Sequence, residues 1–147
     1  MSKTTSFTAN DFLALSKEIE NAIKTKTYIK TSNESALIRS AISRAYYAAF
    51  LSLRRSILIA NPKWKPSIKK GNDDHETLKL TLFSLPPAFL PLANKFNNLR
   101  KRRNNADYDL PPKFDANIIH AEMSNKEAEN IINTISLITN YFSTQYP

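Results

Sequence analysis

Cysteine is absent from this chain of 147 residues, and glycine occurs only once. The absence of cysteine excludes thiolate catalysis, zinc sites with cysteine ligands and iron–sulfur clusters, and it is compatible with a cytosolic protein. No apolar run approaches the roughly 18 residues that a membrane span needs, and residues 1–12 lack the apolar core of a signal peptide. We therefore expect a soluble, cytoplasmic protein that forms one domain over residues 1–147 and buries its core without a disulfide or a metal ion.

Acidic residues are also scarce relative to basic ones. The chain has 13 Asp and Glu against 21 Lys and Arg, which gives a formal net charge of +8 and a pI near 9.7. This excess favours a polyanionic partner such as RNA, DNA or anionic lipid.

The stretch from residue 35 to residue 60, SALIRSAISRAYYAAFLSLRRSILIA, has no glycine or proline over about seven helical turns. Small side chains recur in it at three- and four-residue steps, which lets neighbouring helices approach closely; they are Ala41, Ala45, Ala48, Ala49, Ser52 and Ser56. The pattern predicts a largely buried central helix, with Ser32 or Asn33 as its N-cap.

Four further helices are predicted from caps, apolar periodicity and proline stops. They run from Thr8, with Asp11 completing a short capping box, to about Thr25; from Asp73 or Asp74 to Phe83, before Pro86; from Pro91 to the pair Pro111 and Pro112; and from about Asp115 to Phe142. In the last of these, the capping-box pattern of residues 124–127 predicts a restart or a kink. Neither strand alternation nor an internal repeat is present, so we expect an all-α, up-and-down bundle of four long helices and one short one.

Residues 61–74, NPKWKPSIKKGNDD, combine two prolines, the one glycine and four lysines around the single tryptophan. This composition predicts an exposed basic loop. Trp64, between Lys63 and Lys65, could stack on a nucleic-acid base, or it could cover the edge of the core, which is the commoner use of an indole.

The two histidines of the sequence have no obvious partners. His75 falls in the first turn of the short helix, where a solvated surface residue is the simplest interpretation and a catalytic role is the alternative. His120 has no carboxylate or histidine at metal-ligand spacing, so we interpret it as a surface or satisfied helix residue. No metal site and no cofactor are expected.

An arginine on a core-facing stripe is the most unusual feature of the sequence. Extending the helical angle from Leu92, Phe96 and Leu99 places Arg103 and Asp107 on the inward face. Residues four apart on one face can form an ion pair shielded from water, which Arg44, Tyr46 and Tyr47 of the central helix could join. Such a pair either fixes the helix register or holds Arg103 ready to bind phosphate.

Two segments together resemble the HEPN domain superfamily. They are SRAYYAAF, residues 43–50, and RNNADYD, residues 103–109, and the resemblance covers the chain from about residue 32 to residue 142. It implies a bundle of four or five helices, usually a homodimer, in which the arginine motifs of two protomers face each other across a cleft. Many members are metal-independent endoribonucleases that act as toxins or antiviral effectors, often encoded beside a minimal nucleotidyltransferase. Others are non-catalytic modules for assembly and for RNA or nucleotide binding.

Carried onto this sequence, the resemblance implies a catalytic set and an RNA-binding set. The catalytic set is Arg103, Asp107 and Tyr108, and the RNA-binding set is Arg44, Arg100, Lys101, Arg102 and Asn104. The nuclease members carry a histidine after the arginine with four to six residues between the two, but the corresponding positions here hold Tyr108, Asp109 and Leu110. A tyrosine with a pKa near 10 is a poor base at neutral pH, and the loss of a general base costs about 10²- to 10⁴-fold in rate.

The sequence therefore supports an RNA-directed protein of the HEPN kind, with catalysis left open. Cleavage would be weak unless His75, His120 or a partner accepts the proton that the absent histidine normally takes. Asp107 is another possible acceptor, but pairing with Arg103 would lower its basicity. The alternatives are a non-catalytic HEPN module that dimerises and binds RNA, a nucleotide or a partner protein, and a helical adaptor with no nucleic-acid role.

Overall fold

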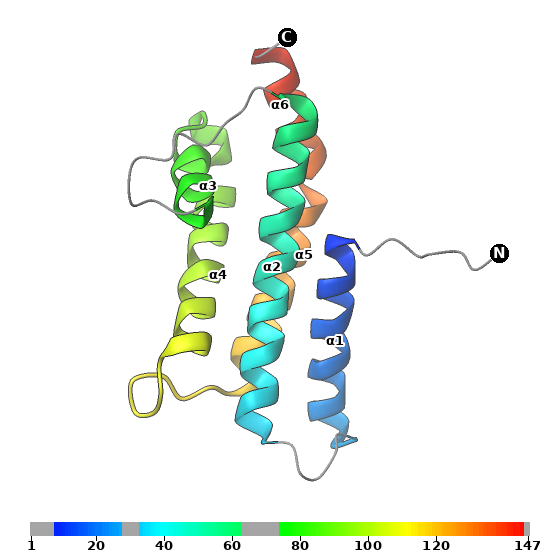
Figure 1. Cartoon of the computed structure of the whole chain (residues 1–147), viewed down its shortest axis with the longest axis vertical. Helices are drawn as coiled ribbons and strands as arrows, with labels where there is room; N and C mark the ends of the chain where they lie inside the picture. The colour runs from blue at the N-terminus through cyan, green and yellow to red at the C-terminus, as the bar shows by residue number, and fades with distance from the viewer. Residues whose placement is uncertain (1–7, 28–32, 63–73, 146–147) are drawn as a thin grey trace, which may run out of the picture.

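Helix α2 (Glu34–Ala60) lies at the centre of the fold and contacts every other helix of the bundle. In the computed structural model, which describes residues 8–27, 33–62 and 74–145, α1 (Ala9–Thr25) lies along one side of α2 and α4 (Leu90–Tyr108) along the other (Figure 1). Helices α5 (Ile118–Asn133) and α6 (Ile135–Gln145) lie behind α2. Helix α3 (Asp74–Phe83) packs on α4, and a 3-10 turn, η1 (Pro87–Phe89), leads from α3 into α4. The prediction of an all-α helical bundle is confirmed.

The small residues of α2 explain its central position. Ala41, Ala45, Ala48 and Ala49 are fully buried, so the neighbouring helices can approach the α2 backbone closely. The larger side chains beside this seam, such as Phe50 and Leu53, fill the core between α2, α4 and α5. Substituting a larger residue for one of these alanines would therefore push two helices apart, at a typical cost of about 1–3 kcal/mol.

The predicted helix starts are present where their caps can be described. The backbone N–H of Thr8 donates to Oδ2 of Asp11 at 2.6 Å, and Oδ1 of Asn33 accepts the N–H of Ala36 at 3.2 Å. Helix α4 ends at Tyr108, before the two prolines that were expected to stop it. Each of these ends follows from a local signal in the sequence, because caps and prolines act within one helical turn.

The predicted restart at residues 124–127 is wrong. Helix α5 is continuous there and begins instead at Asn117, whose side chain accepts the N–H of Ile119 at 3.0 Å. Ser124 is fully buried and its hydroxyl donates back to the carbonyl oxygen of His120 at 2.7 Å, so it does not cap a new helix. The break lies at Thr134, between α5 and α6, which raises the number of α-helices in the described ranges to six.

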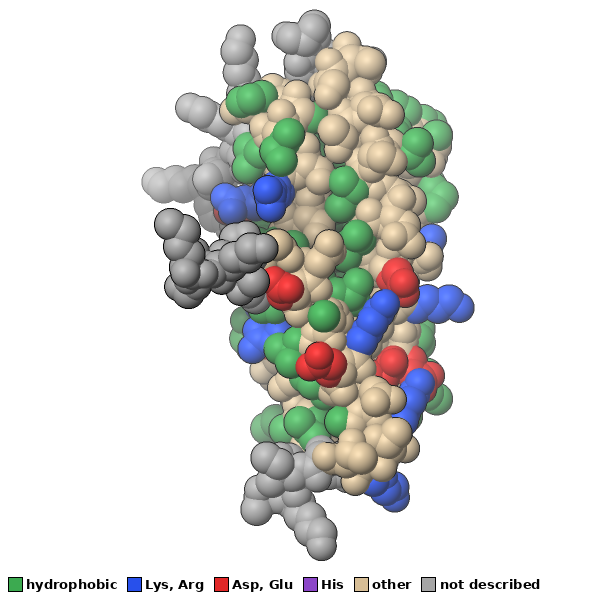
Figure 2. Space-filling model, turned by 90° about the vertical axis from the view of Figure 1, so that its right-hand side faces the viewer, with side chains coloured by type: hydrophobic (Ala, Val, Ile, Leu, Met, Phe, Trp, Pro, Cys, Tyr) green, Lys and Arg blue, Asp and Glu red, His purple; other side chains and the backbone are tan. Residues whose placement is uncertain are grey.

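The face formed by α1 and its neighbours carries both signs of charge. Figure 2 shows acidic and basic side chains interleaved on the lower half of this face. Lys17 lies 3.3 Å from Glu129, and Lys24 lies 3.0 Å from Glu122, so α1 and α5 are linked by ion pairs. No helix within the described ranges is long and apolar enough to cross a membrane.

Candidate functional site

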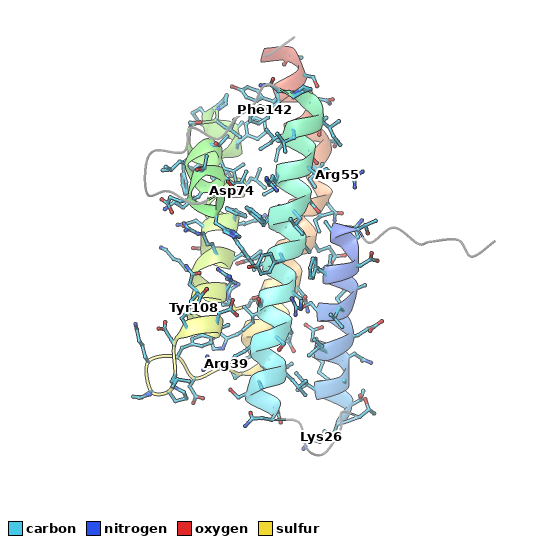
Figure 3. All side chains as sticks on the ribbon, in the orientation of Figure 1. Lys26, Arg39, Arg55, Asp74, Tyr108 and Phe142 are labelled. Atoms are coloured by element: carbon cyan, nitrogen blue, oxygen red, sulfur yellow. The ribbon has the colours of Figure 1, made fainter. Side chains whose placement is uncertain are left out.

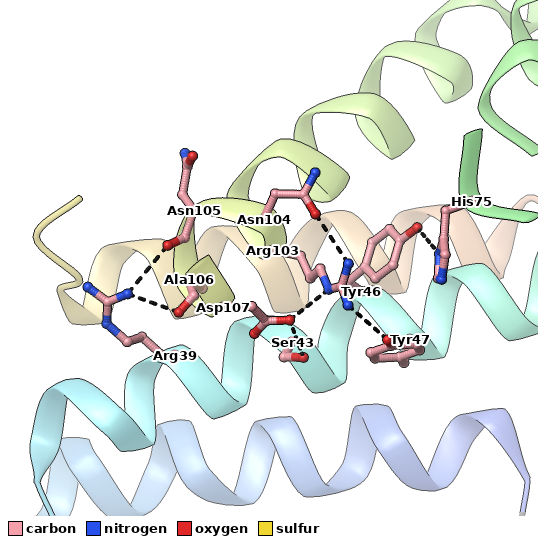
Figure 4. A network of polar contacts seen from close by, with 10 residues as sticks. All are labelled: Arg39, Ser43, Tyr46, Tyr47, His75, Arg103, Asn104, Asn105, Ala106 and Asp107. Carbon is pink, nitrogen blue, oxygen red and sulfur yellow. Dashed lines mark hydrogen bonds and ion pairs between the residues drawn. The ribbon is translucent and has the colours of Figure 1, made fainter. Parts of the chain in front are cut away.

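The predicted pair of Arg103 and Asp107 lies where the last turns of α4 meet α2. Nε of Arg103 is 2.7 Å from Oδ2 of Asp107, Nη2 donates to the hydroxyl oxygen of Tyr47 at 2.9 Å, and Nη1 donates to Oδ1 of Asn104 at 3.2 Å (Figure 4). The Arg103 side chain is only 13 % exposed. Each nitrogen of the guanidinium therefore has a contact on the protein, and the group is held inward.

Arg103 is surrounded by tyrosine rings. Its Cζ lies 5.6 Å from the ring centroid of Tyr46, 5.3 Å from that of Tyr47 and 5.6 Å from that of Tyr108. Its contact with Asp107 is an ion pair rather than a directed hydrogen bond, because the Nε hydrogen is not aimed at the carboxylate. Burial acts to lower the pKa of Arg103, but the Coulombic effects of Tyr47, Asp107, Tyr108 and Tyr46 outweigh it, so the pKa is raised and the side chain stays charged.

His75 joins this cluster, although the sequence placed it on the solvated surface of a different helix. Its Nδ1 lies 2.7 Å from the hydroxyl oxygen of the buried Tyr46, and its ring stacks on Phe50 with centroids 4.1 Å apart. The Tyr46 ring therefore packs near both Arg103 and His75 (Figure 4). Its centroid lies 5.6 Å from Cζ of Arg103 and 5.5 Å from the centroid of the His75 ring. The surface interpretation of His75 is wrong, because α3 packs this residue against α2.

The basic run of residues 100–103 does not form one surface. Arg100 pairs with Glu76 of α3, and the pKa of Glu76 is lowered by its hydrogen bonds to Lys79 and Arg100. Arg102 donates from Nη1 to Glu127 of α5 at 3.0 Å and is only 11 % exposed. Since Arg103 faces α2, the three arginines of this run contact three different helices.

Lys101 is the member of the run that faces solvent, and it has no ion-pair partner among the described residues. Of the other predicted RNA-binding residues, Asn104 contacts Arg103 directly, whereas Arg44 lies over the ring of Phe12 on α1, with its Cζ 5.5 Å from the centroid. The structure thus brings Arg103, Asn104 and Asp107 together with the exposed Tyr108.

Most of the charge excess comes from residues outside the described ranges. Those stretches contribute six lysines and one aspartate, whereas residues 8–27, 33–62 and 74–145 contain fifteen basic and twelve acidic residues. The predicted roles of Trp64, Lys63 and Lys65 concern residues that lie outside the described part. Within it, no group of three or more His, Cys, Asp or Glu side chains could hold a metal ion.

Arg39 has a role that periodicity did not reveal. Its Nη1 donates to the carbonyl oxygens of Asn105, Ala106 and Asp109 at 3.3, 2.9 and 2.6 Å, and its Nη2 donates to that of Phe114 at 2.8 Å. It lies beside the end of α4, near Tyr108 (Figure 3). The carbonyl group of Ala106 belongs to the last turn of α4, where helical partners run out, whereas that of Asn105 also accepts the N–H of Asp109 at 3.0 Å. A side chain of α2 therefore links the end of α4 to the segment that follows it.

Comparisons of the chain with protein-family models, with curated proteins and with solved structures find no match. The resemblance to the HEPN superfamily therefore depends on the two sequence segments and remains a prediction.

Proposed function

We propose that this protein is an RNA-directed member of the HEPN superfamily in which Arg103 binds a phosphate group of RNA. The observation that supports this most directly is the inward, charged guanidinium, oriented by Asp107 and Tyr47 and bordered by the exposed ring of Tyr108. A fixed guanidinium suits phosphate because it stays charged and little ordering of the side chain remains to be done on binding.

Nη1 is the nitrogen best suited to reach the phosphate. Its contact, Oδ1 of Asn104, belongs to the next residue of the same helix, whereas the other two nitrogens are engaged by Asp107 and by Tyr47 of α2. A phosphate oxygen can replace the amide oxygen of Asn104 without breaking a contact between helices. The bound phosphate would then lie at the edge that Tyr108 and Asn104 share.

Metal-independent cleavage of that RNA requires two further events. The 2′-hydroxyl must lose a proton, and the charge that develops on the phosphate must be stabilised. Arg103 supplies the stabilising cation. His75 is the candidate proton acceptor, because an imidazole accepts a proton near neutral pH and this one is linked through Tyr46 to the arginine cluster.

A non-catalytic module is the second candidate function. It is favoured by the low exposure of Arg103 and by the engagement of Arg100 and Arg102 in ion pairs between helices. In that case Arg103 positions RNA or a partner without chemistry. The resemblance further implies a homodimer for both candidates and, for a toxin or defence component, a nucleotidyltransferase partner encoded nearby.

The test is RNA cleavage in EDTA by the purified chain and by Arg103→Ala, with Arg55→Ala as the matched control. Arg55 is exposed on the upper half of α2, away from Tyr108, and its loss removes the same charge (Figure 3). We expect cleavage by the parent and by Arg55→Ala, and none by Arg103→Ala with helical circular dichroism retained. His75→Asn should lower the cleavage rate by about 10²-fold or more.

Cleavage separates the two candidates, whereas RNA binding tests the phosphate contact at Arg103 that both require. For a single-stranded RNA, losing one phosphate contact should reduce the slope of log affinity against log salt by about 0.7 in Arg103→Ala and leave it unchanged in Arg55→Ala. Binding with that slope change but without cleavage would establish the non-catalytic module. Salt-independent binding, or equal slopes in both variants, would refute the phosphate contact at Arg103.

A further inference from the structure

A hollow of about 380 Å³ lies beside Lys101 and Arg102, on a different face of α4 from Arg103. Asn98, Lys101, Arg102 and Asn105 of α4 line one side of it, and their spacing of three, four and seven residues places them on a single helical face. Phe114, His120 and Met123 line the other side. None of these lining residues is acidic. Elsewhere on α4, by contrast, Arg100 and Arg103 are each paired with a carboxylate.

Hydrogen-bond donors converge on this hollow. Lys101 is exposed and has no ion-pair partner among the described residues. Nδ1 of His120 accepts the backbone N–H of Asn117 at 3.1 Å, so the neutral ring carries its proton on Nε2. Burial and the charge of Arg102 lower the pKa of His120, which keeps it in that neutral form. Asn98 and Asn105 add carboxamides, each of which both donates and accepts.

Arg102 gives the hollow a fixed cation. Its guanidinium is held by Glu127 at 3.0 and 3.5 Å and by the hydroxyl oxygen of Ser124 at 3.2 Å. Glu127 offsets this charge, but it does not itself line the hollow. The charge that an entering ligand meets is therefore positive and comes chiefly from Lys101.

The remaining lining is apolar and adaptable. Met123 is 44 % exposed, and its flexible thioether can pack against a flat ring. Phe114 is 9 % exposed and lies 4.9 Å from the imidazole of His120, centroid to centroid. A ligand for this hollow thus needs an anionic group, a flat apolar ring and polar edges for two carboxamides.

We propose that this hollow binds a nucleoside monophosphate unit, either free or within a single strand of RNA. The phosphate group contacts Lys101 and Arg102, and the base lies on Met123 with its edge toward Asn98 and Asn105. Carboxamides suit such an edge because they pair donor with acceptor, as the edges of bases do. The volume is that of a small-ligand site, and the proposal does not depend on any role of Arg103.

The composition of the chain provides its own reporters. The two methionines are Met1 and Met123, and the two histidines are His75 and His120, so selective isotope labelling gives two methyl signals and two imidazole signals. Titration with AMP to about 10 mM covers a weak site with a dissociation constant near 1 mM. We expect the Met123 methyl and the His120 imidazole to shift.

Lys101→Ala should weaken the affinity for AMP, followed by the Met123 shift, by about tenfold or more, as expected for the loss of one charged hydrogen bond. The control is Lys95→Ala, which removes an exposed lysine of the same helix that does not line this hollow and should leave the affinity unchanged. A parallel titration with a short single-stranded RNA separates the two sources of the ligand. A shift with RNA alone assigns the hollow to a nucleotide within a strand, and a shift with AMP assigns it to the free nucleotide as well.

The proposal is overturned if neither AMP nor RNA moves the Met123 and His120 signals, or if Lys95→Ala weakens binding as much as Lys101→Ala. Repeating the AMP titration on Arg103→Ala separates this site from the proposed function. Loss of RNA cleavage or phosphate binding at Arg103 with an intact Met123 shift would leave the hollow as an independent nucleotide site.

Discussion

The hydroxyl group of Tyr47 offers the sharpest test of how Arg103 is held. Tyr47→Phe removes the oxygen that accepts from Nη2 of Arg103 at 2.9 Å and keeps the aromatic ring, whose centroid lies 5.3 Å from Cζ. The substitution therefore removes the hydrogen bond and leaves the cation–π contact in place.

The expected loss of stability follows from the burial of the pair. Hydrogen bonds to charged groups contribute about 1.5–3 kcal/mol, and the lower end applies because Tyr47 is only half-buried. A change of about 1.5 kcal/mol lowers the melting temperature of a chain of this size by about 3–6 °C. The RNA affinity should fall as well, because Arg103 loses the contact that ties it to α2.

The matched control is Tyr108→Phe. Its ring lies at nearly the same distance from Cζ of Arg103, 5.6 Å, but the residue is 72 % exposed and its hydroxyl has no hydrogen-bond partner among the described residues. Thermal unfolding followed by circular dichroism should find Tyr108→Phe within about 0.5 kcal/mol of the parent. The reasoning fails if the two variants are equally stable, since the hydrogen bond would then contribute nothing.

Three further predictions address the rest of the bundle. Glu127→Gln should destabilise the chain by about 2 kcal/mol in denaturant unfolding, because it leaves the 11 % exposed Arg102 without its counter-charge; an unchanged midpoint would contradict this. Burial and the charge of Arg102 lower the pKa of His120 from its ordinary value of 6.5. At acidic pH the unfolded state therefore binds more protons than the folded state, so the free energy of unfolding should fall as the pH drops from 7 to 5. His120→Gln should flatten that dependence, and an equally steep curve would show that His120 is not responsible. Asn33→Ala should cost about 1 kcal/mol by removing the cap of α2, whereas Asn33→Ser should restore most of it.

The features that were predicted correctly depend on neighbours in the sequence. The caps at Thr8 and Asn33 act within one turn, and the pair of Arg103 and Asp107 follows from a spacing of four along a single helix. The number of helices was harder, because the break at Thr134 carries no glycine, proline or capping box, whereas the capping-box pattern that begins at Ser124 belongs to a continuous helix.

The features that were missed depend on contacts between helices. His75 reaches Tyr46 only because α3 packs beside α2, and nothing around residue 75 indicates which helix it will meet. The sequence indicated Arg100 and Arg102 as RNA-binding residues, but it could not identify Glu76 and Glu127 as their ion-pair partners. A run of basic residues predicts a charged surface only when its carboxylate partners are known, and these lie 24 and 25 residues away.

Arg39 ties the last turn of α4 to the segment that follows it, through one guanidinium of α2. On one side of this tether lies Asp107, the partner of Arg103. On the other lies Phe114, which lines the hollow beside Lys101 and Arg102. A ligand that orders one of these two regions would also order the Arg39 contact that the other region shares. The entropic cost of binding a second ligand there would then be smaller. If RNA binds at Arg103 and a nucleotide binds in the hollow, linkage would require each to change the affinity of the other by the same factor, and Arg39→Ala, which removes the tether, would uncouple them.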